Sequence, residues 1–298
     1  MTQHTIFDIQ VALPDARLSA KESSLLGFDS RYQKIHEQLG LLLNLGQLSE
    51  WSERYHQQKL ALCNLITEQY PFVIFYGDVG TGKTATAECI ANRLVKDSET
   101  EDSILFKLSN RVRGSGKVGE MGTLITQAFN EVAQSIGKNR RAILIIDEGD
   151  SLAASRSQDH SHHEDKVAVN TLIQCIDDLR RFNGRIIVFL CTNRLSTLDA
   201  ALQRRAAIVE EFMRPDDEAR QQLFNIDLTG MHLTDQQLKS LVKITGPQAD
   251  QPGWTFSDIR TRLYPAAVAR AFPHRPLTFD DLYQIASTLK ASPVLEDK

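Results

Sequence analysis

A glycine-rich stretch at residues 77–84, with the letters G-D-V-G-T-G-K-T, constrains the fold of this chain more than any other feature. It follows an apolar run at residues 72–76 and opens a helical pattern at residues 84–95. Glycines let backbone N–H groups turn inward and approach phosphate oxygens closely, and a helix N-terminus adds a positive dipole end. Strand, turn and helix in this order predict a phosphate-binding loop on an α/β sheet.

The side chains of this loop have separate expected roles. Lys83 places a positive charge on the β- and γ-phosphates, and Thr84 offers a hydroxyl to Mg²⁺. A chance glycine-rich turn is the alternative, and the complete eight-residue match between a strand and a helix disfavours it. The residues expected to bind nucleotide here are Gly77, Asp78, Val79, Gly80, Thr81, Gly82, Lys83 and Thr84.

An acidic pair, Asp147 and Glu148, ends the apolar run at residues 142–147. The carboxyl end of a buried strand is where an open α/β sheet binds its ligands. We expect Asp147 to hold Mg²⁺ through water and Glu148 to orient and polarise the attacking water. An ordinary acidic turn is the alternative, and the phosphate loop upstream disfavours it. The two motifs together predict hydrolysis of a nucleoside triphosphate, driven by positioning and charge stabilisation.

Three stretches make up the chain: residues 1–70 are polar with helical patches, residues 71–214 alternate strands with helices, and residues 215–298 are helical throughout. Alternation of strand and helix predicts a doubly wound, parallel α/β sheet. Three of its strands are almost continuously apolar, as expected of strands covered on both faces. The five expected strands are residues 72–76, 104–108, 142–147, 185–191 and 207–212, and the expected C-terminal helices are residues 216–223, 234–244, 256–271 and 278–290.

Composition excludes several functional classes. The 298 residues are 42% hydrophobic, which is enough for a core without disulfides or structural metal. A formal net charge of -4 argues against a generally basic nucleic-acid binder. No apolar run is long enough for a membrane span and no secretory signal is visible, so we expect a cytoplasmic protein. We expect reduced thiols at the four scattered cysteines, Cys63, Cys89, Cys175 and Cys191.

These motifs, together with those that follow them, resemble the AAA+ ATPases. Asn193, after the fourth strand, resembles the sensor 1 residue that helps to hold the attacking water. Residues 198–205, L-D-A-A-L-Q-R-R, resemble the element whose arginine reaches the nucleotide of the neighbouring subunit; Arg204 and Arg205 are both candidates, and Arg205 is preferred. The resemblance implies a three-layer αβα ATPase domain, a small helical lid, and a ring of usually six subunits that uses ATP and Mg²⁺.

Two outlying segments also resemble parts of this family's nucleotide site. Residues 25–29, L-L-G-F-D, resemble the segment that packs against adenine, which assigns Gly27 and Phe28 to the site. Residues 254–260, W-T-F-S-D-I-R, resemble the sensor 2 region of the lid. Arg260 is the sensor 2 candidate, and Arg262 stays open as the alternative.

Residues 111–120, R-V-R-G-S-G-K-V-G-E, occupy the position of the first pore loop, which grips substrate polypeptide in ring remodellers. Alignment with that loop puts Lys117 where an aromatic residue usually stands and Val118 beside it. A basic, glycine-rich loop could instead bind DNA phosphates or be a solvated connection. Residues 155–165 hold a histidine cluster, which we expect to be a solvated loop rather than a metal site.

Within the AAA+ family, residues 151–156, 167–177 and 262–267 resemble the pachytene-checkpoint-type remodellers of HORMA-domain proteins. This resemblance implies an ATP-driven ring that unfolds or disassembles a HORMA-domain partner. Short bacterial relatives accompany a HORMA protein and a cyclic-nucleotide synthase in anti-phage signalling (CBASS), so that synthase is a possible second partner. Two alternatives stay open: a DNA-acting AAA+ loader or transposition helper, and a nucleotide switch that does not hydrolyse ATP.

Overall fold

The structure is a computed structural model that describes residues 6–43, 45–98, 103–113, 120–136, 140–152 and 163–294. The chain forms two compact units. The large unit contains the described residues of Met1–Glu22, Gly27–Tyr76 and Thr84–Glu211, and the lid unit contains those of Ser23–Leu26, Gly77–Lys83 and Phe212–Lys298. The phosphate loop therefore groups with the lid unit, and the helix that follows it groups with the large unit.

A mixed sheet of six strands forms the centre of the large unit. Its order is β1-β3-β4-β5-β2-β6, and the neighbours β3/β4, β4/β5 and β5/β2 pair in parallel. Every residue of β4 and β5 is buried, which explains their continuous apolar sequences. All five expected strands are present: β2 (Tyr70–Gly77), β3 (Ser103–Leu108), β4 (Ala142–Ile146), β5 (Ile186–Thr192) and β6 (Ala206–Phe212).

The sixth strand, β1 (Phe7–Leu13), corrects the expectation of a five-stranded, wholly parallel sheet. It pairs antiparallel with β3, with Gln10 opposite Phe106. Only Leu13 of this strand is buried, because β1 lies at the edge of the sheet. An edge strand with so few buried residues lacks the apolar run that identifies the inner strands, and the sequence of residues 1–70 therefore indicates only a polar stretch with helical patches.

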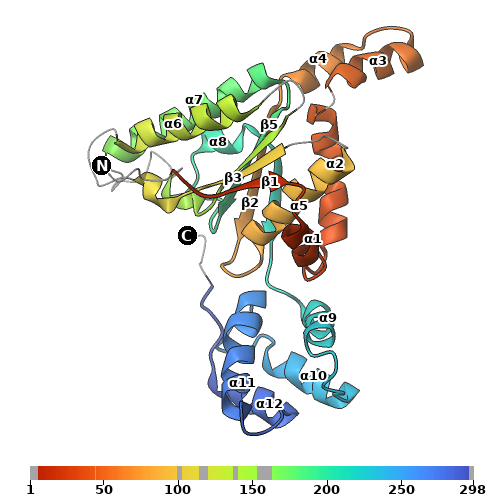
Figure 1. Cartoon of the computed structure of the whole chain (residues 1–298), viewed down its shortest axis with the longest axis vertical. Coiled ribbons are helices and arrows are strands. Elements are labelled where there is room, and N and C mark those ends of the chain that lie inside the picture. The colour runs from red at the N-terminus through yellow and green to blue at the C-terminus, as the bar shows by residue number, and fades with distance from the viewer. Residues whose placement is uncertain are drawn as a thin grey trace. The chain divides into compact units, whose positions relative to one another are not determined.

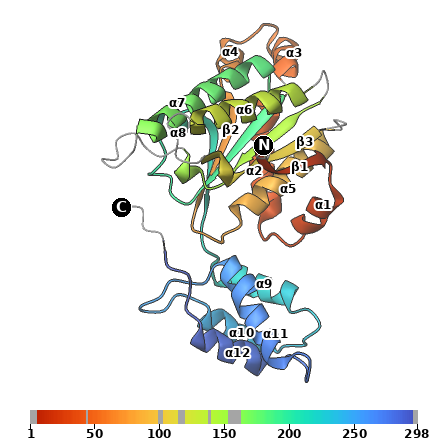
Figure 2. The ribbon, with the colours of Figure 1, turned by 60° about the vertical axis from the view of Figure 1, so that its left-hand side comes forward.

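Helices cover both faces of the sheet (Figures 1 and 2). One layer contains α6 and α7, and the other contains α2 and α5. Ile125 of α6 and Leu172 of α7 share a buried cluster with Phe72 and Ile74 of β2. The helices of this unit are α1 (Ala16–Glu22), α2 (Phe28–Leu43), α3 (Leu45–His56), α4 (Ala61–Thr67), α5 (Lys83–Asp97), α6 (Glu120–Ser135), α7 (His163–Asp177) and α8 (Ala200–Gln203), with 3₁₀ turns at Asn110–Arg113, Gly149–Ser151 and Asp178–Phe182.

The lid unit is helical around a separate core that includes Phe224, Trp254 and Leu282. One continuous helix was expected over residues 256–271, but the structure has a π-helical segment followed by an α-helix that carries Pro265 in its first turn. Proline has no N–H to donate to the preceding turn, which explains why regular α-helix starts only there. The elements are α9 (Asp217–Asp227), α10 (Asp235–Ile244), the π segment (Asp258–Leu263), α11 (Tyr264–Ala271) and α12 (Phe279–Thr288).

All four cysteines are free thiols, as expected. Burial raises the pKa of the Cys89 thiol to about 12, so that this side chain stays protonated in the core. Within the described ranges, no helix has the length and apolar character needed to cross a membrane.

Candidate functional site

The predicted acidic pair and the predicted sensor residue lie at one edge of the sheet. Strands β4 and β5 are parallel neighbours, with Ile146 opposite Leu190, so their carboxyl ends lie side by side. Asp147 and Glu148 follow β4, and Asn193 follows β5. The sheet therefore brings these three side chains to the edge where ligands of open α/β sheets bind.

Thr84 and Asp147 meet directly. The Thr84 hydroxyl, in the first turn of α5, donates a hydrogen bond of 2.9 Å to Asp147 Oδ1. Lys107 Nζ, from β3, lies 3.1 Å from Asp147 Oδ2. A hydroxyl and a carboxylate within hydrogen-bond distance are the oxygen donors that Mg²⁺ prefers. This pair therefore fits a magnesium ion, and Lys107 is a charged neighbour that the sequence analysis missed, although a lysine within an apolar strand was a visible signal.

Glu148 is held by a residue that sequence reasoning did not identify. Asn110 Nδ2, just after β3, donates a hydrogen bond of 3.1 Å to Glu148 Oε2. The Glu148 backbone has a left-handed φ of 51°, and its N–H donates to Asp147 Oδ1 at 3.0 Å. The carboxylate expected to polarise water is therefore turned toward the end of β3. Only the position of Asn110 beyond an apolar strand could have pointed to it.

Asp150 joins the ends of β4 and β5. Its Oδ1 atom accepts a hydrogen bond of 3.1 Å from the Thr192 hydroxyl and one of 3.4 Å from the Asn193 backbone N–H. This carboxylate fixes the backbone of the predicted sensor residue relative to the loop that carries Glu148. Sequence reasoning missed Asp150, because nothing local distinguishes it from a surface acid.

The phosphate loop is described within the lid unit. Lys83 is 7% exposed, and its ammonium donates hydrogen bonds of 2.8 Å to the carbonyl oxygens of Gly77 and Asp78. The Thr81 hydroxyl donates to the same Asp78 oxygen at 2.8 Å. Gly80 has a φ of +79°, in the region that glycine adopts without strain. The positive charge of Lys83 is thus held against the backbone of the loop itself, and a positive charge at this position fits a bound phosphate group.

The paired arginines differ in their surroundings. Arg205 donates to both carboxylate oxygens of Asp177, from Nε at 2.6 Å and from Nη2 at 2.9 Å. These bonds raise the pKa of Arg205 and lower that of Asp177. Arg204, in contrast, is exposed. Arg205, the preferred finger candidate, is thus bonded to Asp177 within its own subunit, whereas Arg204 lies exposed at the surface.

Phe28 is packed inside the large unit. Its ring is 4% exposed, stacks against Tyr32 with centroids 6.0 Å apart, and faces the Arg93 guanidinium at 5.8 Å. The preceding residue, Gly27, has a left-handed φ of +69°. The assignment of Gly27 and Phe28 to an adenine site stays a prediction.

Both sensor 2 candidates make ion pairs inside the lid unit. Arg260 donates two hydrogen bonds of 2.7 Å to Asp227 and one of 2.9 Å to the Ser24 carbonyl. Arg262 donates one of 2.8 Å to Asp258. The pore-loop candidates Lys117 and Val118 lie outside the described residues, as do His160 and His162 of the histidine cluster. Residues 163–165, which were expected to belong to a solvated loop, instead form the start of α7. Among the residues that the structure describes, no acidic, histidine or cysteine group forms a metal cluster.

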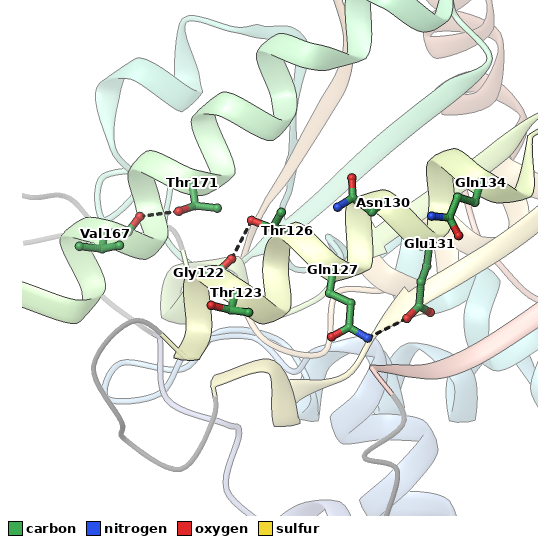
Figure 3. Close-up of a pocket in the computed structure, with 9 residues that line it drawn as sticks. All are labelled: Gly122, Thr123, Thr126, Gln127, Asn130, Glu131, Gln134, Val167 and Thr171. Atoms are coloured by element: carbon green, nitrogen blue, oxygen red, sulfur yellow. Dashed lines mark hydrogen bonds between the residues drawn. The ribbon is translucent and has the colours of Figure 1, made fainter.

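A hollow of about 710 Å³, lined mainly by polar residues, lies along α6 and α7 (Figure 3). Its polar groups bond to near neighbours: the Thr126 hydroxyl donates to the Gly122 carbonyl at 2.9 Å, and Gln127 donates to Glu131 at 3.1 Å. None of the predicted nucleotide-binding residues contributes to it. The lining residues are Gly122, Thr123, Thr126, Gln127, Asn130, Glu131, Gln134, Val167 and Thr171.

Comparison with known proteins agrees with this geometry. The family model "ATPase family associated with various cellular activities (AAA)" matches residues 73–214. The CD-NTase-associated protein 6 of Escherichia coli strain KTE188 is 65% identical over 297 residues, which cover 100% of both chains. The protein of the same name from strain MS 115-1 is 37% identical and covers 98% of this chain and 97% of its own.

Solved structures show the same similarity. A chain of the E. coli MS115-1 HORMA:CdnC:Trip13 complex superposes with a TM-score of 0.88 at 36% identity, over 97% of each chain. Rhizobiales Trip13 superposes with a TM-score of 0.72 at 29% identity, over 96% of this chain and 99% of its own.

Proposed function

The chain belongs to the AAA ATPase family, and on that basis we propose that it is an ATP-driven ring that remodels a HORMA-domain protein in cyclic-nucleotide (CBASS) anti-phage signalling in the cytoplasm. Support comes from relatives named CD-NTase-associated protein 6 and from a similar chain solved in a complex with HORMA and CdnC. The described residues add no observation in favour of a DNA-acting protein.

The hydrogen bond between Thr84 and Asp147 carries the proposed chemistry, because it joins the helix of the phosphate loop to the acidic end of β4. Lys83 binds the β- and γ-phosphates, and Thr84 with Asp147 holds Mg²⁺. When bound, Mg²⁺ neutralises charge that develops on the phosphates. Glu148 orients and polarises the attacking water, and Asn193 helps to hold that water in place.

We assign Asn110 the role of holding Glu148 back before the substrate protein engages. A carboxylate oxygen that accepts the Asn110 amide is turned toward β3 and is less available to a water molecule. Release of this bond would remove the Asn110 amide from Oε2 and make that oxygen more available to water. Asn110 follows β3 and directly precedes residues 111–120 in the sequence, which places it beside the pore-loop candidate along the chain.

The ring arrangement completes the proposed site. An exposed arginine at the end of α8 can reach a nucleotide bound to a neighbouring subunit, where it would stabilise charge in the transition state. Arg204 meets this condition, whereas Arg205 is occupied by Asp177. We also propose a ring of six subunits. Within each subunit we propose a division into residues 1–70, an ATPase domain at 71–214 and a lid at 215–298.

Substitution of Glu148 tests this function most directly. We expect Glu148→Gln to bind ATP without hydrolysing it, and therefore to hold the HORMA-domain partner in a stable, ATP-dependent complex that a pull-down detects. Glu131→Gln, at an exposed position of α6, is the matched control and should hydrolyse ATP and release the partner as the unaltered chain does. Partner binding that does not depend on nucleotide would refute the remodelling function.

A further inference from the structure

Arg214, just after β6, donates four hydrogen bonds that connect it to three segments of the lid unit. Nε donates to Asp78 Oδ2 in the phosphate loop at 2.6 Å. Nη1 donates to the carbonyls of Gly253 at 2.7 Å and Ser292 at 2.9 Å, and Nη2 donates to the Pro293 carbonyl at 2.9 Å. The Arg214 and Asp78 side chains are 12% and 14% exposed, so solvent screens this ion pair only weakly.

The C-terminal segment at residues 292–293 is held from a second side by Asp258. The Ser292 hydroxyl donates to Asp258 Oδ1 at 2.6 Å, and the Ser292 backbone N–H donates to Oδ2 at 3.2 Å. Burial alone would raise the pKa of Asp258, but hydrogen bonds from Ser292, Thr255 and Arg262 outweigh it and lower that pKa. The carboxylate is therefore ionised, and its bonds to the segment are charge-assisted.

Asp258 also leads back to the phosphate loop. Its Oδ2 accepts from the Thr255 N–H at 3.0 Å, and the nearby Ser257 N–H donates to the Gly80 carbonyl at 3.1 Å. A Cβ built on Gly80 would lie 2.6 Å from Ser257 Cβ and 2.8 Å from Thr255 Oγ1. The lid backbone thus contacts the loop so closely that only glycine fits there.

These contacts form a closed circuit that starts and ends in the phosphate loop. It runs from Asp78 through Arg214 to Ser292, then through Asp258 to the segment that touches Gly80. The carbonyl of Asp78 accepts the Lys83 ammonium, so any shift of Asp78 moves the charge that meets the phosphates. Displacements of about 1 Å can change the efficiency of a site by about 100-fold.

We propose that residues 292–293 form a strut that holds the phosphate loop in its binding conformation through Arg214, which makes Arg214 and Ser292 positioning residues for ATP. This inference rests on the proposed ATPase function. The strut and the loop are far apart in the sequence, with 136 positions between Asp78 and Arg214 and 78 between Arg214 and Ser292.

The test compares Arg214→Lys and Ser292→Ala with a control in the same lid unit, Arg275→Lys. Arg275 also binds a poorly exposed aspartate, Asp281 at 2.6 Å, but neither residue takes part in the circuit. Titration with fluorescent ADP measures affinity, and thermal unfolding measures the fold. We expect the ADP dissociation constant to rise about tenfold for Arg214→Lys, because lysine keeps the charge and loses the planar fork, and about threefold for Ser292→Ala.

A double-mutant cycle separates the strut from general loss of lid stability. Asp78→Asn and Ser292→Ala do not touch each other, so their effects on ADP affinity would add if the sites were independent. We expect the second substitution to have a smaller effect once the first is present. Unchanged affinity in Arg214→Lys and Ser292→Ala, or additive effects in the cycle, would overturn the strut alone. Failure of the unaltered chain to bind nucleotide would overturn the proposed function and the strut with it.

Discussion

At the scale of single residues, the bond between Asn110 and Glu148 is the contact that bears most directly on the proposed chemistry. Its Nδ2–Oε2 distance of 3.1 Å is that of an ordinary hydrogen bond. Such a bond contributes about 0.5–1.5 kcal/mol, which corresponds to a change of roughly two- to tenfold in an equilibrium. The proportion of subunits in which Glu148 accepts the Asn110 amide can therefore be shifted by a free-energy change of this size.

Asn110→Ala should raise the ATPase rate measured without partner by about two- to tenfold, because the carboxylate is no longer held at β3. The additional stimulation by the partner should shrink by a similar factor. Asn130→Ala, at an exposed position of α6, is the matched control and should leave both rates unchanged. A lower basal rate in Asn110→Ala, measured by phosphate release, would contradict the holding role.

At the scale of elements, α12 illustrates how a lid helix depends on one carboxylate. Asp281 accepts two hydrogen bonds of 2.6 Å from Arg275, and also caps the helix with Thr278 in a reciprocal pair. The Arg275 and Thr278 bonds hold the pKa of Asp281 well below its usual range. A lowered folded-state pKa means that the stabilisation is present above the unfolded pKa of about 4 and is lost as the pH falls below it.

Asp281→Asn should therefore lower the unfolding temperature at pH 7, and the difference from the unaltered chain should diminish as the pH is taken from about 4 downward. Asp280→Asn changes the neighbouring, exposed acid of the same helix and should have a much smaller effect at both ends of this range. Calorimetry at a series of pH values measures the unfolding temperature of each variant and of the unaltered chain. A difference that stays constant with pH would show that the ionised carboxylate is not the source of the stability.

The elements also show why some of the site was predictable from sequence and some was not. The phosphate loop and the Asp147–Glu148 pair are each made of consecutive residues, and buried parallel strands are recognisable as apolar runs. Both motifs and the inner strands were therefore predictable from local sequence. Asn110 and Arg214 gain their roles from partners 38 and 136 positions away, and no local pattern encodes such contacts. Strand β1 was not predicted because an edge strand buries too few side chains to give a recognisable apolar pattern.

At the scale of the whole molecule, the exposed Arg204 means that each nucleotide site is expected to need two subunits. Arg205 is instead committed to Asp177, with side chains 25% and 38% exposed, and stabilises the end of α8. Adjacent arginines thus have separate proposed tasks, one between subunits and one within a subunit.

Arg204→Ala should reduce the ATPase rate by about 10³-fold, as loss of an arginine finger does, with no change in unfolding temperature. Arg205→Ala should lower the unfolding temperature, because it leaves Asp177 without its arginine partner. Mixed rings give the decisive measurement: Arg204→Ala and Glu148→Gln are each expected to be inactive, and mixing them should restore activity where an intact Glu148 lies beside an intact Arg204. Mixed rings that form and stay inactive would rule out action between subunits.

The antiparallel pairing of β1 with β3 also has a consequence for the order in which the chain is made. Gln10 leaves the ribosome long before its partner Phe106, and synthesis proceeds at about 5–20 residues per second. The first strand must therefore wait on the order of 5–20 seconds as an unpaired segment. β2 waits still longer for β5, so the sheet that carries the nucleotide site is completed only after residues 186–192 have been made. A nascent chain stalled before residue 186 would emerge without a completed sheet, and hence without the means to bind ATP.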